Sequence, residues 1–208
     1  MLYLLLLLSY LCGAIPFGLL FGRMKGVDVR QGGSGNIGAT NVNRQLGKTM
    51  GLLTLLADVG KAVLPMFIVA AILADKPTAS DWVTLCGAAA VFGHLFPVYL
   101  KFRGGKGVAT AFGMLLYIKL PAALILALLF IGVVYLSGYV SAGSLTAAAM
   151  MPVVLSLAGA DRLQVMVSFG LFLLIWIKHR QNVIRLFKGE EKSWKKPLTT
   201  TSTEERQE

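Results

Sequence analysis

Long apolar runs occupy most of the sequence, and they constrain the fold more than any other feature. A helix needs about 20 mostly apolar residues to cross the hydrocarbon core of a bilayer. Runs of roughly that character lie near 1–22, 50–73, 82–99, 107–118, 120–137, 140–158 and 162–177. We therefore expect an all-α polytopic membrane protein with seven transmembrane helices. The run at 107–118 is short, so five spans plus re-entrant segments remain an alternative.

The composition supports this class, because 56% of residues are hydrophobic and only 14% are charged. A soluble domain carries about 25% charged residues. The first apolar run has no basic segment before it, so we expect a retained span and not a cleaved signal peptide. A single membrane domain over 1–191 suffices, followed by a polar tail at 192–208 that we expect to be disordered.

Lysine and arginine residues predict the orientation, because cytoplasmic loops of membrane proteins are enriched in them. Most lie in 23–49, in 100–106 and beyond 178, whereas the alternate connections carry only Lys76, Lys119 and Arg162. The amino terminus is therefore expected outside and the carboxyl terminus in the cytoplasm. This distribution also accounts for the net charge of +10 without a nucleic-acid partner.

Four polar stretches then fall on the cytoplasmic side. Glycine-rich turns and basic loops have ordinary structural explanations when taken singly. Four on one face, two of them with a histidine beside basic residues, favour a functional site instead. They are residues 32–44, 93–110, 137–144 and 178–191.

The first stretch, "GGSGNIGATNVNR", suits an anion. Without a Cβ, glycine lets successive main-chain N–H groups point into one concavity that holds anionic oxygens. Neither this loop nor "RGGKG" fits a nucleotide-binding motif. A compact phosphate ester or acyl phosphate is therefore the expected ligand. The candidate binding residues in this stretch are Gly33, Ser34, Gly35, Asn36, Gly38, Thr40, Asn41 and Arg44.

Charged and titratable side chains elsewhere add further candidates. Asp58 and Lys61 share one face of the second span, where an ion pair is either functional or structural. His94 is equally compatible with a helix-end role and a catalytic one. His179 and Asn182 are stronger candidates, because they lie one helical turn apart and combine a proton acceptor with an amide. No HxxxxD or GxSxG motif accompanies either histidine.

At "GSGNIGATN", "GHLFPVYLKFRGGKGVAT" and "HRQNVIRLFKGEE" the sequence resembles the bacterial acyl-phosphate:glycerol-3-phosphate acyltransferase family, in order and nearly to Glu191. The resemblance implies a seven-helix membrane fold, a cytoplasmic active site in the bacterial inner membrane, and no metal or cofactor. It implies that a fatty acyl phosphate and glycerol 3-phosphate are the substrates. The family's functional positions fall on Ser34, Asn36, Arg44, Gly104, Gly105, Lys106, Gly107, Ser141, His179, Asn182 and Glu190.

These residues suggest a direct acyl transfer to the 1-hydroxyl that yields lysophosphatidic acid. Arg44 and Lys106 are expected to hold the phosphate of glycerol 3-phosphate, with a hydrogen bond from Ser141. The main chain around Ser34 would bind the donor and stabilise charge at the attacked carbonyl. His179 and Asn182 would orient the hydroxyl, whose proton goes to His179 or to the departing phosphate.

Two other functions are compatible with parts of the sequence. A transporter of a phosphorylated solute would need polar residues through the whole membrane, but the outer halves of the spans are almost entirely apolar. A scaffold that binds lipid headgroups through its basic tail would leave the glycine loops unexplained. We therefore expect a monomeric enzyme in the bilayer.

Overall fold

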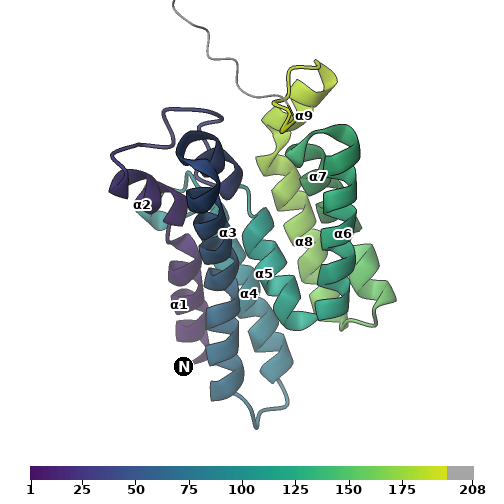
Figure 1. The fold of residues 1–208 in the computed structure, drawn as a ribbon. Coiled ribbons are helices and arrows are strands. Elements are labelled where there is room, and N and C mark those ends of the chain that lie inside the picture. The colour runs from purple at the N-terminus through teal and green to yellow at the C-terminus, as the bar shows by residue number, and fades with distance from the viewer. Residues whose placement is uncertain (196–208) are drawn as a thin grey trace, which may run out of the picture.

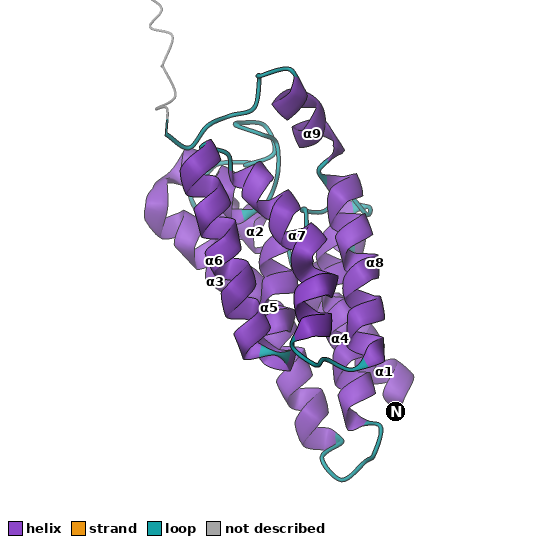
Figure 2. Cartoon of the chain, turned by 90° about the vertical axis from the view of Figure 1, so that its right-hand side faces the viewer, coloured by secondary structure: helices purple, strands orange, loops and turns teal. Residues whose placement is uncertain are grey.

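A computed structural model describes residues 1–195, and all regular structure within them is helical (Figures 1 and 2). The expectation of an all-α protein is confirmed. Residues 196–208, most of the tail expected to be disordered, lie outside the described residues. In chain order the elements are α1 (Leu2–Ala14), α2 (Phe17–Met24), α3 (Ala39–Ile72), α4 (Ala79–Leu95), the 3-10 turn η1 (Val98–Leu100), α5 (Val108–Ile118), α6 (Leu120–Ser137), α7 (Val140–Leu157), α8 (Arg162–Lys178) and α9 (Arg180–Phe187).

These helices make the chain a multi-pass membrane protein. Five segments are long and apolar enough to cross a bilayer, and α8 with α9, which meet at 59°, would make a sixth. Helix α5 has 11 residues, fewer than a straight span requires. Five to six candidate spans are therefore supported, and the expected count of seven stays a prediction.

Two breaks in the helices have local causes. The apolar run expected at 1–22 divides into α1 and α2 at Pro16, which has no N–H to continue a helix. Helix α3 changes direction at Gly47, whose φ of +83° lies in the left-handed region that favours glycine. The first turns of α3 therefore pack against the part of the helix that follows Gly47, so closely that a Cβ at Gly51 would collide with Asn43.

The helices pack in sequence-adjacent and distant pairs. Helix α1 lies against α4, α3 against α4 and α5, and α7 against α6 and α8. The α1–α4 approach is so close that a Cβ on Gly13 would collide with the main chain of Ala90. The buried core between these helices includes Met66, Cys86 and Leu155.

All of the long polar connections lie at one end of this bundle, the upper end in Figures 1 and 2. They are residues 25–38, the segment 96–107 with η1, the α6–α7 turn, and the bend from α8 into α9. The amino terminus and the turns after α3, α5 and α7 lie at the opposite end. The four polar stretches thus meet, as the sequence predicted.

Candidate active site

A cavity of about 630 Å³ opens where these connections meet. Its walls come from the first loop, α3, the end of α4, the segment 96–107, α5, α6, α7, α8 with its bend into α9, and the residues after α9. Most of the predicted site residues line it: Gly33, Ser34, Asn36, Gly38, Thr40, Asn41, Arg44, Asp58, His94, Lys106, Gly107, Ser141, His179 and Asn182. Five predicted residues do not line it: Gly35, Lys61, Gly104, Gly105 and Glu190.

Asn41 holds the glycine-rich loop in shape. Its side chain is almost fully buried and donates to the carbonyl oxygens of Val29 at 2.8 Å and Asn36 at 2.7 Å. Its own oxygen accepts from the main-chain N–H of Ser34 at 2.7 Å. A side chain on Gly33, whose φ is +62°, would collide with that oxygen. Asn41 therefore positions the loop.

A connected set of polar side chains forms the opposite wall. The Lys106 ammonium donates to the Asn182 amide oxygen at 2.6 Å, and the Asn182 amide nitrogen donates to Glu191 at 2.6 Å. The same carboxylate accepts from the Ser141 hydroxyl at 2.8 Å and from Arg185 at 2.7 Å. Three segments far apart in the sequence thereby share one hydrogen-bond network.

The carboxylate of this network belongs to Glu191, whereas the sequence pointed to its neighbour Glu190. Glu190 is exposed and lies outside the cavity lining, while the Glu191 side chain is 7% exposed. Gly189 between α9 and these residues has a φ of +72°, a left-handed turn that decides which carboxylate faces inward. Arg185 and Glu191 are site residues that the sequence did not single out.

Ser141 lies in the first turn of α7 and is buried. Ser144, one helical turn further along α7, also lines the cavity. Its hydroxyl, however, donates back to the carbonyl of Val140 at 2.9 Å. Of the two, Ser141 is the one tied to the polar network.

The charge states of the site follow from burial. Burial lowers the pKa of Lys106 from 10.5 to about 8, partly offset by the nearby Glu191 carboxylate. Hydrogen bonds from Asn182 and its neighbours outweigh burial and lower the pKa of Glu191. At neutral pH the site thus holds a charged lysine beside a charged carboxylate.

His179 is neutral at pH 7. It lies just after the last residue of α8, and burial lowers its pKa to about 4, with the Lys106 charge acting in the same direction. Its Nδ1 lies 2.8 Å from the carbonyl oxygen of Ile175. Because a carbonyl only accepts, Nδ1 carries the ring hydrogen and Nε2 is left as an acceptor.

Asp58, Lys61 and His94 form a buried cluster below this polar wall. Lys61 lies 2.8 Å from the Asp58 carboxylate and donates to the carbonyl of Ile15 at 3.1 Å. His94 lies 3.6 Å from the same carboxylate, and its main-chain oxygen accepts from Gly105 at 3.0 Å. The pair predicted from the sequence is therefore present. Together with His94, the pair links the end of α1, α3 and α4 to the loop that carries Lys106.

The segment after α9 closes one side of the site. Lys192 donates to the carbonyl of Gly33 at 2.7 Å, and its own carbonyl accepts from Arg44 at 3.1 Å. Two residues later, the main-chain N–H of Trp194 donates to Gly138 at 3.0 Å. Residues 192–195 thus tie the first loop to the α6–α7 turn.

Below the polar groups the cavity is apolar. This part lies between α3, α5, α6 and α7, within the segments that have the composition of membrane spans. An acyl chain entering there would contact only hydrocarbon. The apolar lining comprises Leu55, Phe112, Leu115, Leu126, Phe130, Ile131 and Met151.

Comparison with known proteins places this geometry among acyltransferases. Residues 3–189 match the family described as glycerol-3-phosphate acyltransferase. A protein of that name from Desulfotalea psychrophila is 52% identical over 191 residues, which cover 91% of this chain and 96% of the relative. One from Geobacter sulfurreducens is 43% identical over 189 residues, which cover 90% of this chain and 94% of the relative.

Two solved structures have the same fold. A crystal structure of PlsY (YgiH), an integral membrane glycerol 3-phosphate acyltransferase in its glycerol 3-phosphate form, superposes with a TM-score of 0.86 at 37% identity. It covers 93% of this chain and 95% of that one. The lysophosphatidic acid form of the same protein superposes with a TM-score of 0.84 at 36% identity. The match covers 92% of this chain and 94% of that structure's chain.

Proposed function

The chain belongs to the glycerol-3-phosphate acyltransferase family and is an acyltransferase, and on this basis we propose that it transfers a fatty acyl group from an acyl phosphate to the 1-hydroxyl of glycerol 3-phosphate. The products are lysophosphatidic acid and inorganic phosphate. The observation that carries the proposal is a single cavity that joins a cationic polar end to an apolar channel. A water-soluble anion and a membrane-embedded chain can meet only in such a place.

Arg44 and Lys106 bind the phosphate of glycerol 3-phosphate. Both line the cavity, and a guanidinium and an ammonium group make charge-assisted hydrogen bonds to phosphate oxygens. Ser141 has one hydroxyl hydrogen, which it donates to Glu191 in the absence of substrate. Donation from Ser141 to the substrate therefore requires that hydrogen bond to exchange.

The glycine-rich loop receives the donor. Ser34, Asn36 and Gly38 line the cavity, and Asn41 fixes the geometry of their loop. The main-chain N–H groups of Ser34 and Gly38 already donate to Asn41 and Asn36. The Asn36 N–H and the Ser34 hydroxyl are therefore the donors that stabilise the negative charge developing on the attacked carbonyl oxygen. The acyl chain then extends into the apolar channel, where each buried CH₂ contributes about 0.8 kcal/mol.

The reaction is a direct displacement. The 1-hydroxyl oxygen bonds to the carbonyl carbon, the bond from that carbon to the phosphate oxygen breaks, and phosphate leaves. The donor is already activated, so no acyl-enzyme is needed. Asn182 keeps one amide hydrogen beyond its bond to Glu191, and this hydrogen orients the substrate hydroxyl.

The departing phosphate accepts the hydroxyl proton. Even a phosphate monoester dianion takes up a proton with a pKa of about 6, and the departing phosphate carries one more negative charge and is more basic, whereas the pKa of His179 is lowered to about 4. The phosphate is therefore the stronger base of the two. Before the reaction the unprotonated Nε2 of His179 accepts the hydrogen bond of this hydroxyl and holds its oxygen in line. The same hydrogen then passes to the phosphate oxygen as the new C–O bond forms. The cluster of Asp58, Lys61 and His94 positions the Lys106 loop from below, because the His94 carbonyl accepts from the Gly105 N–H.

The proposal includes a membrane topology. Seven spans with the amino terminus outside place the polar end of the bundle in the cytoplasm of a bacterial inner membrane. Glycerol 3-phosphate is available on that side. The proposal also takes residues 1–191 as a single membrane domain that acts as a monomer.

The test is release of inorganic phosphate by the purified protein supplied with palmitoyl phosphate and glycerol 3-phosphate, with lysophosphatidic acid measured in parallel. Equal amounts of both products are expected. A matched reaction with palmitoyl-CoA should give little product, because neither glycine-rich loop fits a nucleotide-binding motif. Equal or faster acylation from the thioester would rule out acyl phosphate as the donor.

A further inference from the structure

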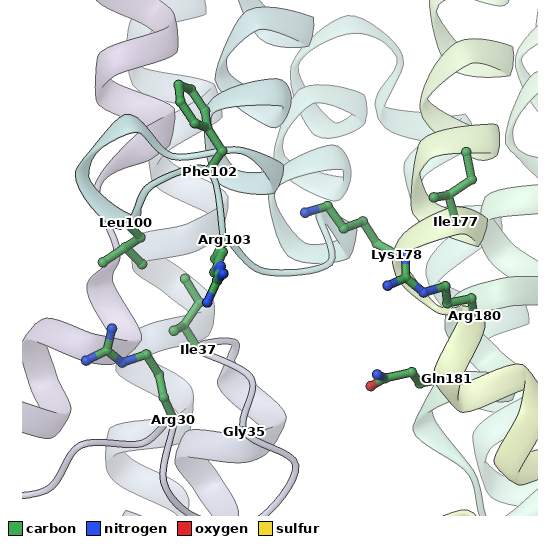
Figure 3. Close-up of a pocket in the computed structure, with 11 residues that line it drawn as sticks. Arg30, Gly35, Ile37, Leu100, Phe102, Arg103, Ile177, Lys178, Arg180 and Gln181 are labelled. Atoms are coloured by element: carbon green, nitrogen blue, oxygen red, sulfur yellow. The ribbon is translucent and has the colours of Figure 1, made fainter.

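A second cavity, of about 550 Å³, lies at the same end of the bundle and shares no lining residue with the first (Figure 3). Its walls come from the first loop, the segment after η1, and the α8–α9 bend. These are the segments that also build the candidate active site. Its lining residues are Arg30, Gly35, Ile37, Leu100, Phe102, Arg103, Gly104, Ile177, Lys178, Arg180 and Gln181.

The two cavities lie on opposite sides of the same backbone. Lys106 lines the active-site cavity, whereas Arg103 lines the second one. His179 lines the first, whereas Lys178 and Arg180 on either side of it line the second. Two of the predicted site glycines that are missing from the first cavity, Gly35 and Gly104, line this one.

The second cavity carries an excess of positive charge. Arg103, Lys178 and Arg180 project toward it from two sides in Figure 3, and within residues 1–195 none of them forms a salt bridge. Among the cations of the lining, Arg30 alone has an acidic partner within the described residues, and its Nε donates to Asp28 at 2.9 Å. Lys178 is held in place by the Leu95 carbonyl at 2.5 Å.

The rim of the cavity has the character of a membrane surface. Lys178 is the last residue of α8, and Ile177 directly before it is 56% exposed. On the facing wall, Phe102 is 59% exposed and takes an uncommon positive φ of 63°. Cationic groups above exposed apolar side chains match the level at which lipid phosphates meet acyl chains.

We propose that this second cavity binds the phosphate group of an anionic membrane phospholipid. Arginine grips phosphate oxygens through paired N–H donors, and Arg103 and Arg180 approach the cavity from opposite walls. The general enrichment of lysine and arginine in the cytoplasmic loops of membrane proteins would explain how many basic residues lie at this end of the bundle. It would not explain why three distant segments place them around one hollow, with apolar side chains on its membrane side.

Binding there would restrain both loops of the active site. The lipid phosphate would bridge Arg103, three residues before Lys106, and Arg180, which follows His179. This site does not depend on which acyl donor the enzyme uses. Its occupancy is therefore measured as binding, without reference to turnover.

The experiment is native mass spectrometry of the full chain in detergent, titrated with dioleoyl phosphatidylglycerol or with dioleoyl phosphatidylcholine. Wild type is expected to retain phosphatidylglycerol in preference to phosphatidylcholine. The double variant Arg103→Gln/Arg180→Gln should bind phosphatidylglycerol at least about tenfold more weakly, since two charge-assisted contacts are lost. Lys48→Gln/Lys188→Gln is the matched control, because it removes the same charge from exposed residues outside both cavities and should bind as wild type does.

Equal affinity of wild type and the arginine variant for phosphatidylglycerol would overturn the proposal, as would equal retention of the two lipids by wild type. A parallel titration with inorganic phosphate separates the sources of the anion. If inorganic phosphate binds wild type and not the arginine variant, while phosphatidylglycerol binds both, the cavity takes a soluble anion and the lipid assignment fails. Should the glutamine pair unfold, Arg103→Lys/Arg180→Lys keeps the charge without the paired donors, and an intermediate loss of phosphatidylglycerol affinity is expected.

Discussion

The ammonium group of Lys106 lies 2.6 Å from the amide oxygen of Asn182, although 76 residues separate them. This contact joins the glycine-lysine loop after η1 to α9. It points the charge of Lys106 toward the polar end of the cavity and fixes which way the Asn182 amide faces. The amide nitrogen is then the atom available to Glu191 and to a substrate hydroxyl.

Removing either cation should weaken the binding of glycerol 3-phosphate. Loss of a hydrogen bond to a charged group costs about 1.5–3 kcal/mol, which is roughly a ten- to hundred-fold rise in KM for Lys106→Ala or Arg44→Ala. Steady-state kinetics in detergent measure it, with Lys48→Ala as a control outside both cavities. Near-normal KM in a folded variant would remove that residue from the phosphate site.

Activity should fall at alkaline pH. Lys106 is charged below its pKa of about 8 and loses that charge above it. Because kcat/KM reports ionisations of the free enzyme, kcat/KM for glycerol 3-phosphate is expected to decrease as pH rises through about 8. In Lys106→Arg the guanidinium stays charged, so the alkaline decrease should disappear even if the absolute rate is lower. An unchanged profile would assign the ionisation to another group.

Substitution of the two adjacent glutamates, Glu190 and Glu191, should have very different effects on stability and turnover. Glu191→Gln removes the charge that Ser141, Asn182 and Arg185 contact, so both the free energy of unfolding and turnover should fall. The expected loss of stability is about 1.5–3 kcal/mol. Glu190→Gln changes an exposed side chain and should stay within about 0.5 kcal/mol. Thermal unfolding in detergent compares the pair, and equal effects would contradict the inward position of Glu191.

Blocking the apolar channel should shorten the preferred acyl chain. Ala148 is buried, lines the channel, and lies two helical turns below Ser141 on α7. Ala148→Phe is expected to reduce turnover of palmitoyl phosphate while sparing octanoyl phosphate. Met150→Phe, on an exposed position outside the cavity, is the control. If both donors lose activity equally, the chain follows another path.

The proposed topology predicts one-sided labelling. In a Cys12→Ala/Cys86→Ala background, which removes the native cysteines, Thr49→Cys should react with an impermeant maleimide only from the cytoplasmic side. Thr78→Cys, in the turn after α3 at the opposite end of the bundle, should react only from outside. The reverse pattern would place the candidate site on the face that lacks glycerol 3-phosphate.

The helices were predictable because the apolar runs alone specify membrane spans. The run at 120–137 corresponds to α6, and the run at 162–177 to α8, within one residue. Successive spans cross the membrane in opposite directions, so the sequence also predicted that the glycine-rich loop, Lys106 and His179 would lie on the same side. What the sequence could not specify were backbone turns that depend on tertiary contacts.

Glu191 illustrates this limit. In "GEE" the two carboxylates are chemically identical, and only the left-handed turn at Gly189 together with the position of Arg185 decides which one is buried. The first turns of α3 and the break at Gly47 were likewise not predicted, because they lie in the polar segment before the apolar run at 50–73. A second cavity behind the active-site loops could not be anticipated, because its residues alternate along the chain with those of the first.

The contacts of residues 191–195 have a consequence for biosynthesis. Glu191 supplies the carboxylate at the centre of the polar network, and Lys192 and Trp194 connect the two ends of the cavity rim. A nascent chain that has inserted α1 through α8 therefore holds both glycine loops but no complete site. The complete site is assembled only when residues 191–195 have left the ribosome and folded back onto the two loops.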